Sequence, residues 1–125
     1  YFLFIFFLMG ESSHFNRSIR IGWGFLRKIL GMLRIDDLKG CNFSVSRIAL
    51  ERINGFDEAY EGYGREDTDV EIRLQHLGLK IQSLKGRALQ YHVWHEPRPF
   101  TQRNEGLLAR VRKEKLVRCE RGLST

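Results

Sequence analysis

The clearest hydrophobic pattern lies in the middle of the chain. Val70, Leu74 and Leu77 recur at i, i+4 and i+7, and the residues between them are mostly polar. This spacing places the apolar side chains on one face of a helix. Gly78 follows directly and is a typical stop signal. A second, basic helix is predicted over residues 104–118. Its apolar side consists of Leu107, Leu108, Val111 and Leu116.

Several short apolar or alternating segments are typical of strands. Residues 1–9 form an aromatic-rich run that suits a buried strand. Residues 43–45 predict a short strand, and residues 79–84 and 88–95 alternate apolar and polar positions. Together with the helices, these segments indicate the α/β class.

Two further helical segments are predicted. Ser46 is placed to cap a short helix that runs to about Ile53, and the following Asn54-Gly55 pair is placed to end it. Residues 19–33 have the spacing of an amphipathic basic helix, with apolar residues every four positions, but three glycines weaken it. The alternative is a long surface loop that becomes ordered only beside another domain.

Composition limits the size and class of the protein. The chain has 125 residues, which suits one domain. Its formal net charge is +6, with basic residues gathered in 17–39 and 103–121 and acidic ones in 51–71. This distribution suggests an anionic partner, such as nucleic acid, lipid headgroups or sugar phosphates. The two cysteines form no CxxC pair, so a structural zinc site is not expected.

The start of the chain carries no recognisable targeting segment. The first apolar run has about half of the length that a membrane span needs, and it lacks the basic start of a signal peptide. The sequence begins with Tyr1 rather than Met, and we therefore expect it to be a piece of a larger protein.

An acidic cluster follows two glycines in the segment "GYGREDTD". Four acidic residues fall between Glu66 and Glu71. Favourable interaction with the helix dipole explains one or two of them. A carboxylate at a helix start behind a flexible glycine turn can also act as a general base on a hydroxyl. A solvated helix start and an active-site carboxylate therefore both stay open at this point.

Five other residues could take part in binding or remain structural. His92 and His95 lie in "YHVWHE", where they could bind a metal or a phosphate, or only form local hydrogen bonds. Asn42 lies two residues after Gly40, and residues 40–42 are equally typical of a plain turn. Tyr63 and Trp94 could stack on sugar rings or belong to the core.

The order of these motifs resembles a known family. The stretch "GCNFSVSRIALERINGFDEAYEGYGREDTDVEIRLQHLG" resembles the C-terminal, acceptor-side half of GT-A glycosyltransferases, closest to bacterial family 2 members and the galactosyltransferase-like C-terminal region. The "YHVWHE" segment resembles the strand whose histidine binds the metal in polypeptide N-acetylgalactosaminyltransferases and galactosyltransferases. The resemblance covers residues 38–97 and leaves 98–125 as a basic helical tail of a single domain, 1–125. It implies a partial GT-A fold, with a short mixed sheet and flanking helices.

The resemblance also implies a role for each matching residue. Asp67 would be the catalytic base, and Glu66 would hydrogen-bond the acceptor or donor sugar. His92 would bind the metal, with His95 as the reserve candidate. The residues expected near the sugar are Gly64, Tyr63, Asn42 and Trp94. The expected cofactor is Mn²⁺ or Mg²⁺, bound with the nucleotide-sugar donor and placed to offset the charge of the departing diphosphate.

The implied function is metal-dependent transfer of a sugar from a nucleotide sugar to a glycan hydroxyl, with inversion, in polysaccharide biosynthesis. The expected location is the cytoplasm or the inner face of the membrane, and peripheral contact of residues 19–33 with a membrane stays open. No Asp-x-Asp donor motif precedes Gly40, so we expect the nucleotide-binding half to be missing and the chain to be inactive alone. The alternative is a small basic module that binds nucleic acid or a membrane surface, but it does not account for "GYGREDTD". The transferase hypothesis includes no nucleic-acid partner.

Overall fold

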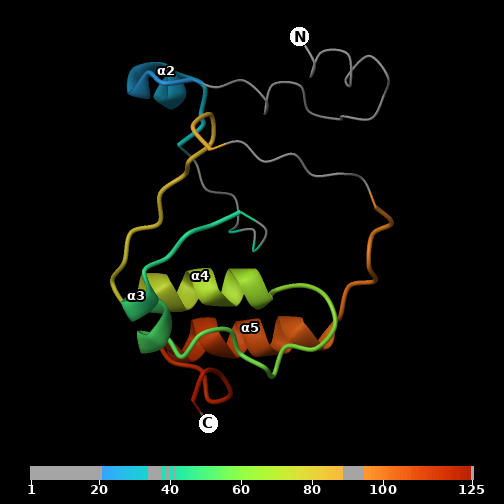
Figure 1. Ribbon diagram of the computed structural model, residues 1–125. Coiled ribbons are helices and arrows are strands. Elements are labelled where there is room, and N and C mark those ends of the chain that lie inside the picture. The colour runs from blue at the N-terminus through green and yellow to red at the C-terminus, as the bar shows by residue number, and fades with distance from the viewer. Residues whose placement is uncertain (1–20, 34–37, 39, 41, 89–94, 125) are drawn as a thin grey trace. The chain divides into compact units, whose positions relative to one another are not determined.

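The computed structural model describes residues 21–33, 38, 40, 42–88 and 95–124 (Figure 1). Across these residues the structure has four helices and no strand. The helices are α2 (Gly24–Ile29), α3 (Arg47–Arg52), α4 (Glu66–His76) and α5 (Arg103–Glu114). The chain divides into two compact units, one formed by residues 1–35 and 82–96 and the other by 36–81 and 97–125. Each unit is described by itself.

The predicted α/β class is wrong for the described part of the chain. Residues 43–45 and 79–84 form no strand, although their patterns suggested one. A strand is stabilised by hydrogen bonds to a neighbouring strand, and these segments pair with none in the described part of the chain. The strand predicted at residues 1–9, and most of the one at 88–95, lie outside the described residues. The short mixed sheet of a partial GT-A fold is therefore not observed.

Helix α4 provides the core of the second unit, as its periodicity predicted. Val70 and Leu74 are buried and pack against Ala49 and Ile53. The stop at Gly78 is also confirmed, because this residue has a φ of 87° directly after the helix. The apolar stripe therefore buries the face that the sequence indicated.

Helices α4 and α5 lie side by side and run parallel (Figure 1). Near their N-termini, Arg65 pairs with Glu105, with 2.6 Å between nitrogen and oxygen. Near their C-termini, His76 Nδ1 lies 2.8 Å from the carbonyl oxygen of Leu116. The predicted basic helix is confirmed, although it ends at Glu114 rather than near residue 118. Its predicted apolar positions include the buried Leu108 and Val111.

Helix α3 begins and ends at the residues that the sequence indicated. The Ser46 hydroxyl accepts a hydrogen bond from the Ala49 N–H at 3.2 Å, which satisfies one free donor of the first turn. Asn54 and Gly55 have φ angles of 68° and 75°, and this left-handed turn ends the helix. Both signals are local in sequence, and both are confirmed.

The first unit differs from its predicted helix at residues 19–33. Helix α2 is only six residues long, and Phe25 and Ile29, expected on a packed face, are 78% and 63% exposed. The buried residue is instead Arg27, whose guanidinium donates to the carbonyl oxygens of Ser83 at 2.8 Å and Lys85 at 3.0 Å. These bonds fix α2 by polar contacts rather than by its apolar spacing. None of the described helices is long and apolar enough to cross a membrane.

Candidate functional site

The loop before α4 has an unusual backbone. Gly62, Gly64 and Arg65 have φ angles of 74°, 105° and 78°, so three of four consecutive residues occupy the left-handed region. Glycine adopts this conformation without steric cost. At Gly64 a side chain is also excluded by space, because a Cβ there would lie 2.6 Å from Cδ2 of Phe100. The "GYG" segment thus forms a tightly turned and closely packed approach to the helix.

Residues after the second proline hold this loop in place. The Thr101 N–H donates to the Tyr63 carbonyl at 3.0 Å, and the Thr101 hydroxyl accepts from the Tyr63 N–H at 3.2 Å. The buried Asn104 side chain donates to the carbonyl oxygens of Glu61 at 3.1 Å and Gly64 at 2.8 Å. Sequence reasoning missed both Thr101 and Asn104, since nothing local marks a hydrogen bond across some forty residues.

This loop lines an open pocket with a volume of about 190 Å³. Its lining residues are Leu38, Tyr63, Gly64, Arg65, Glu66, Asp67, Thr68 and Phe100. Four of the predicted site residues, Tyr63, Gly64, Glu66 and Asp67, are therefore brought together. Tyr63 and Phe100 are each about half exposed, at 49% and 46%. The pocket combines exposed aromatic surface with carboxylates, which suits an amphipathic, hydroxyl-rich ligand.

Two carboxylates of α4, one turn apart, hold the chain that precedes α3. Oδ2 of Asp67 accepts a hydrogen bond from the Gly40 N–H at 2.7 Å. Oε2 of Glu71 accepts one from the Leu38 N–H, also at 2.7 Å. Residues four apart share one face of a helix, so the two bonds form a pair. Asp67 is thus partly buried, oriented by the backbone and still open to the pocket.

Phe100 and Arg65 form another side of the pocket. The Arg65 guanidinium lies 5.6 Å from the Phe100 ring centroid, a cation–π geometry. The same guanidinium donates from Nε to Glu105 at 2.8 Å. Phe100 was not predicted as a site residue, and the only local signal was its position just before a basic helix.

The third acid of the cluster has a different environment. Asp69 is fully buried, and its Oδ2 accepts from Nε and Nη2 of Arg73 at 2.8 and 2.5 Å. Arg73 is also fully buried and donates to the carbonyl oxygens of Ile53 and Gly55 at 2.6 and 2.9 Å. Burial raises the pKa of Asp69, although the hydrogen bonds from Arg73 act against this. This carboxylate is closed to substrate and acts as an internal anchor.

Tyr60 lies beside this buried pair. Its hydroxyl is buried without a hydrogen bond of normal geometry, as is Oδ1 of Asp69. Burial, together with the negative charge of Asp69, raises the pKa of Tyr60 above its ordinary value. Ionisation of this phenol therefore opposes the folded state.

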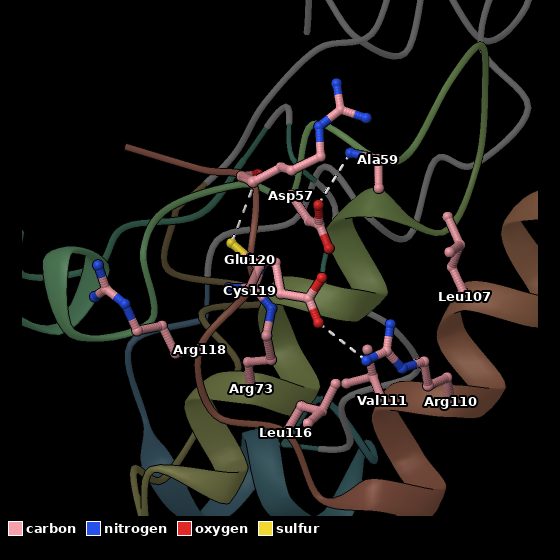
Figure 2. A pocket seen from close by; sticks show the side chains of 11 residues that line it. Asp57, Ala59, Arg73, Leu107, Arg110, Val111, Leu116, Arg118, Cys119 and Glu120 are labelled. Carbon is pink, nitrogen blue, oxygen red and sulfur yellow. Dashed lines mark hydrogen bonds and ion pairs between the residues drawn. The ribbon is translucent and has the colours of Figure 1, made fainter. Parts of the chain in front are cut away.

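A second and smaller pocket is lined by charged side chains that form ion pairs with other protein groups. Figure 2 shows Glu120 directed toward Arg110, and the two are 3.0 Å apart. Arg73, which lines the same pocket, is held by Asp69. Cys119 is a buried free thiol, and burial raises its pKa. Because these polar groups already have protein partners, we assign no chemistry to this pocket.

Of the remaining predicted residues, only Asn42 can be compared with the Asp67 pocket. Asn42 is exposed and does not line the pocket. His92 and Trp94 lie outside the described residues. His95 belongs to the first unit, where its Nδ1 lies 3.0 Å from the Glu96 carbonyl oxygen. Where side chains are described, no group of three His, Cys, Asp or Glu residues could hold a metal ion.

The chain belongs to the galactosyltransferase family, because residues 21–96, more than half of its length, match the family model described as the N-terminal domain of galactosyltransferase. The matched range begins before residue 38, where the resemblance in the sequence began, and stops before Phe100. No curated protein and no solved structure matches the chain. Membership is thus established at the level of galactosyltransferases, without assignment to glycosyltransferase family 2 or to a C-terminal half.

Proposed function

We propose that this chain forms the acceptor-side part of a glycosyltransferase, which moves a sugar from a nucleotide-sugar donor to a hydroxyl of a glycan, and that Asp67 is the general base. The observation that carries this proposal is the environment of Asp67. It is a partly buried carboxylate, oriented by the Gly40 amide, in an open pocket flanked by the aromatic rings of Tyr63 and Phe100. Membership of the galactosyltransferase family supports sugar transfer as the reaction class.

The chemistry asked of Asp67 is one proton transfer. As the acceptor oxygen attacks the anomeric carbon, its proton passes to the Asp67 carboxylate. The new carbon–oxygen bond forms while the bond to the diphosphate breaks, and the electron pair leaves with the diphosphate. A single displacement of this kind inverts the anomeric configuration. Glu66, which lines the same pocket, is placed to hydrogen-bond a sugar hydroxyl.

The donor side of the proposal rests on resemblance. The expected Mn²⁺ or Mg²⁺ would neutralise the diphosphate, with His92 or His95 as its ligand, but the described side chains do not assemble a metal site. We therefore derive no catalytic step through a metal. A separate nucleotide-binding half, a role in polysaccharide biosynthesis and a place at the inner face of the membrane belong to the same proposal.

The decisive substitution is Asp67→Asn, which keeps the size of the side chain and removes the base. In the complete enzyme that includes the nucleotide-binding half, we expect turnover with a nucleotide-sugar donor and a sugar acceptor to fall by about 10²–10⁴-fold, the range typical for a general base. Binding of the acceptor sugar, followed by NMR shifts of the Tyr63 and Phe100 rings, should be retained. The matched control is Glu58→Gln, which changes an exposed carboxylate outside the pocket.

Two outcomes would contradict the proposal. Normal turnover in Asp67→Asn would remove the base assignment. Failure of every sugar tested to shift the Tyr63 and Phe100 signals, combined with binding to nucleic acid or anionic vesicles, would favour the basic binding module instead.

A further inference from the structure

Gly40 and Asp67 approach each other more closely than any residue with a side chain would allow. A Cβ at Gly40 would overlap Oδ1 of Asp67 and lie 2.9 Å from its Cγ and 3.0 Å from its Oδ2. All three atoms of the carboxyl group therefore rest against the bare face of the glycine. A side chain at residue 40 would therefore displace this carboxyl group.

The Gly40 backbone also fixes the orientation of that carboxylate. Its N–H donates to Oδ2 at 2.7 Å, a short bond to a charged acceptor. The bond thus fixes one oxygen of a carboxylate that lines the pocket.

We infer that Gly40 is the positioning residue of the proposed base: its amide anchors Oδ2, and its missing side chain leaves room for the carboxyl group of Asp67. This inference rests on the proposed function of Asp67 and adds a residue that acts through it. Gly40 itself touches no reacting atom. Its effect is geometric, and displacement of a reacting group by about 1 Å can cost on the order of 10²-fold in rate.

The hydrogen bond between Leu38 and Glu71 provides a comparison. It distinguishes positioning of Asp67 by Gly40 from simple attachment of the chain to α4. Glu71 holds Leu38 to α4 through the same kind of bond and at the same distance of 2.7 Å. Glu71 does not line the pocket. If the only role of these bonds were to fasten the chain to α4, weakening either one should have the same consequence. If Gly40 positions Asp67, only the Gly40 change should alter the chemical step.

The test compares Gly40→Ala with Glu71→Gln in the complete enzyme that includes the nucleotide-binding half, using a nucleotide-sugar donor and a sugar acceptor. We expect Gly40→Ala to lower kcat by about 10²-fold while the KM for the acceptor changes little. Glu71→Gln should keep a normal kcat, although its thermal midpoint falls. Equal losses of kcat in the two variants, or a large rise in KM confined to Gly40→Ala, would overturn the positioning role.

A double substitution gives the second criterion. Residues that act as a unit show strongly non-additive effects. Asp67→Asn combined with Gly40→Ala should therefore be no slower than Asp67→Asn alone. A further loss of about 10²-fold in the double variant would mean that Gly40 acts independently of Asp67 and would refute the inference.

A measurement without catalysis keeps this inference distinct from the proposed function. NMR coupling through the hydrogen bond, from the Gly40 nitrogen to the Asp67 carboxyl carbon, should be detectable in the wild-type protein and lost in Gly40→Ala. Absence of the coupling in the wild type would contradict the hydrogen bond between Gly40 and Asp67 itself. If the coupling is present but Asp67→Asn retains normal turnover, the proposed function fails while the contact stands.

Discussion

Asp67 and Asp69 are two residues apart on the same helix, yet they belong to different environments. Asp67 lies at an open pocket and is held by one backbone amide of Gly40. Asp69 is fully buried and is held by the guanidinium of Arg73. The helix turns by about 200° between them, so their side chains leave α4 in nearly opposite directions.

The acidic residues of this cluster therefore have different roles. Asp69 stabilises the turn after α3 through Arg73, which donates to the carbonyl oxygens of Ile53 and Gly55. Glu71 attaches the chain at Leu38. Only the acids at the start of α4 face the pocket. Neighbouring acids can thus serve internal structure and candidate chemistry at once, and burial distinguishes them better than sequence position.

The largest expected effect comes from breaking the buried pair. Asp69→Asn should destabilise the protein by about 3–5 kcal/mol, because it leaves the Arg73 guanidinium buried without a counter-charge. The identical change at Asp67 should cost less than about 1 kcal/mol, since an amide oxygen can still accept from Gly40. Urea unfolding followed by circular dichroism measures both. Similar losses in the two variants would remove the contrast between the two acids.

An intermediate effect is expected at alkaline pH. The folded-state pKa of Tyr60 is raised above its ordinary value of 10.0, mainly by burial. Its stabilising contribution is therefore complete below pH 10 and is lost as the pH rises toward the folded-state pKa. The slope cannot exceed the roughly 1.4 kcal/mol per pH unit of one proton. Solvent screening of this partly buried residue limits the size of the pKa shift, and therefore the pH range over which stability is lost.

Tyr60→Phe isolates this contribution. At neutral pH the change should alter stability by less than about 1 kcal/mol, since the hydroxyl that it removes makes no hydrogen bond of normal geometry in the described part of the chain. Above pH 10 the variant should lose stability less steeply than the wild type. Thermal melts across pH, with the half-exposed Tyr63→Phe as the matched variant, make the comparison. Equal alkaline slopes for wild type and Tyr60→Phe would contradict the assignment.

The smallest effect is expected at a surface pair that has the spacing of the buried one. Arg47 and Glu51 are also four residues apart and lie 2.7 Å from each other, but their side chains are 89% and 51% exposed. Glu51→Gln should cost only about 0.3–0.5 kcal/mol, and high salt should abolish the difference. Chemical denaturation at two salt concentrations measures it. A cost that approaches that of Asp69→Asn would mean that burial is not what separates the pairs.

The sequence predicted those features whose causes are local. The spacing of Val70 and Leu74, the cap at Ser46 and the left-handed turn at Asn54 are each set within a few residues, and each is confirmed. Strands depend on a partner that the local pattern does not supply, so the expected sheet was wrong. The burial of Arg27 in place of its apolar neighbours arises from carbonyl groups more than fifty positions away.

At the candidate site, too, the sequence predicted local features but not contacts between distant residues. The motif named Tyr63, Gly64, Glu66 and Asp67 as candidates, and these near neighbours in sequence line one pocket. It gave no indication of Phe100, which lines the pocket from beyond the prolines. Gly40 lies in a turn, as expected, but no sequence pattern indicated that Asp67 packs against this glycine. A local sequence pattern does not reveal such contacts between residues that are far apart in the chain.

The parallel arrangement of α4 and α5 has a consequence for how the protein is made. Two consecutive parallel helices require a long return segment, and here residues 82–96 of that segment belong to the other unit. On the ribosome, α4 emerges well before its packing partner α5. The Asn54 side chain cannot donate its hydrogen bonds to the carbonyl oxygens of Cys119 and Ser124 until those residues have also emerged. Closing such long loops slows folding. The nascent chain should therefore gain protease resistance late, only after Cys119 and Ser124 have left the exit tunnel.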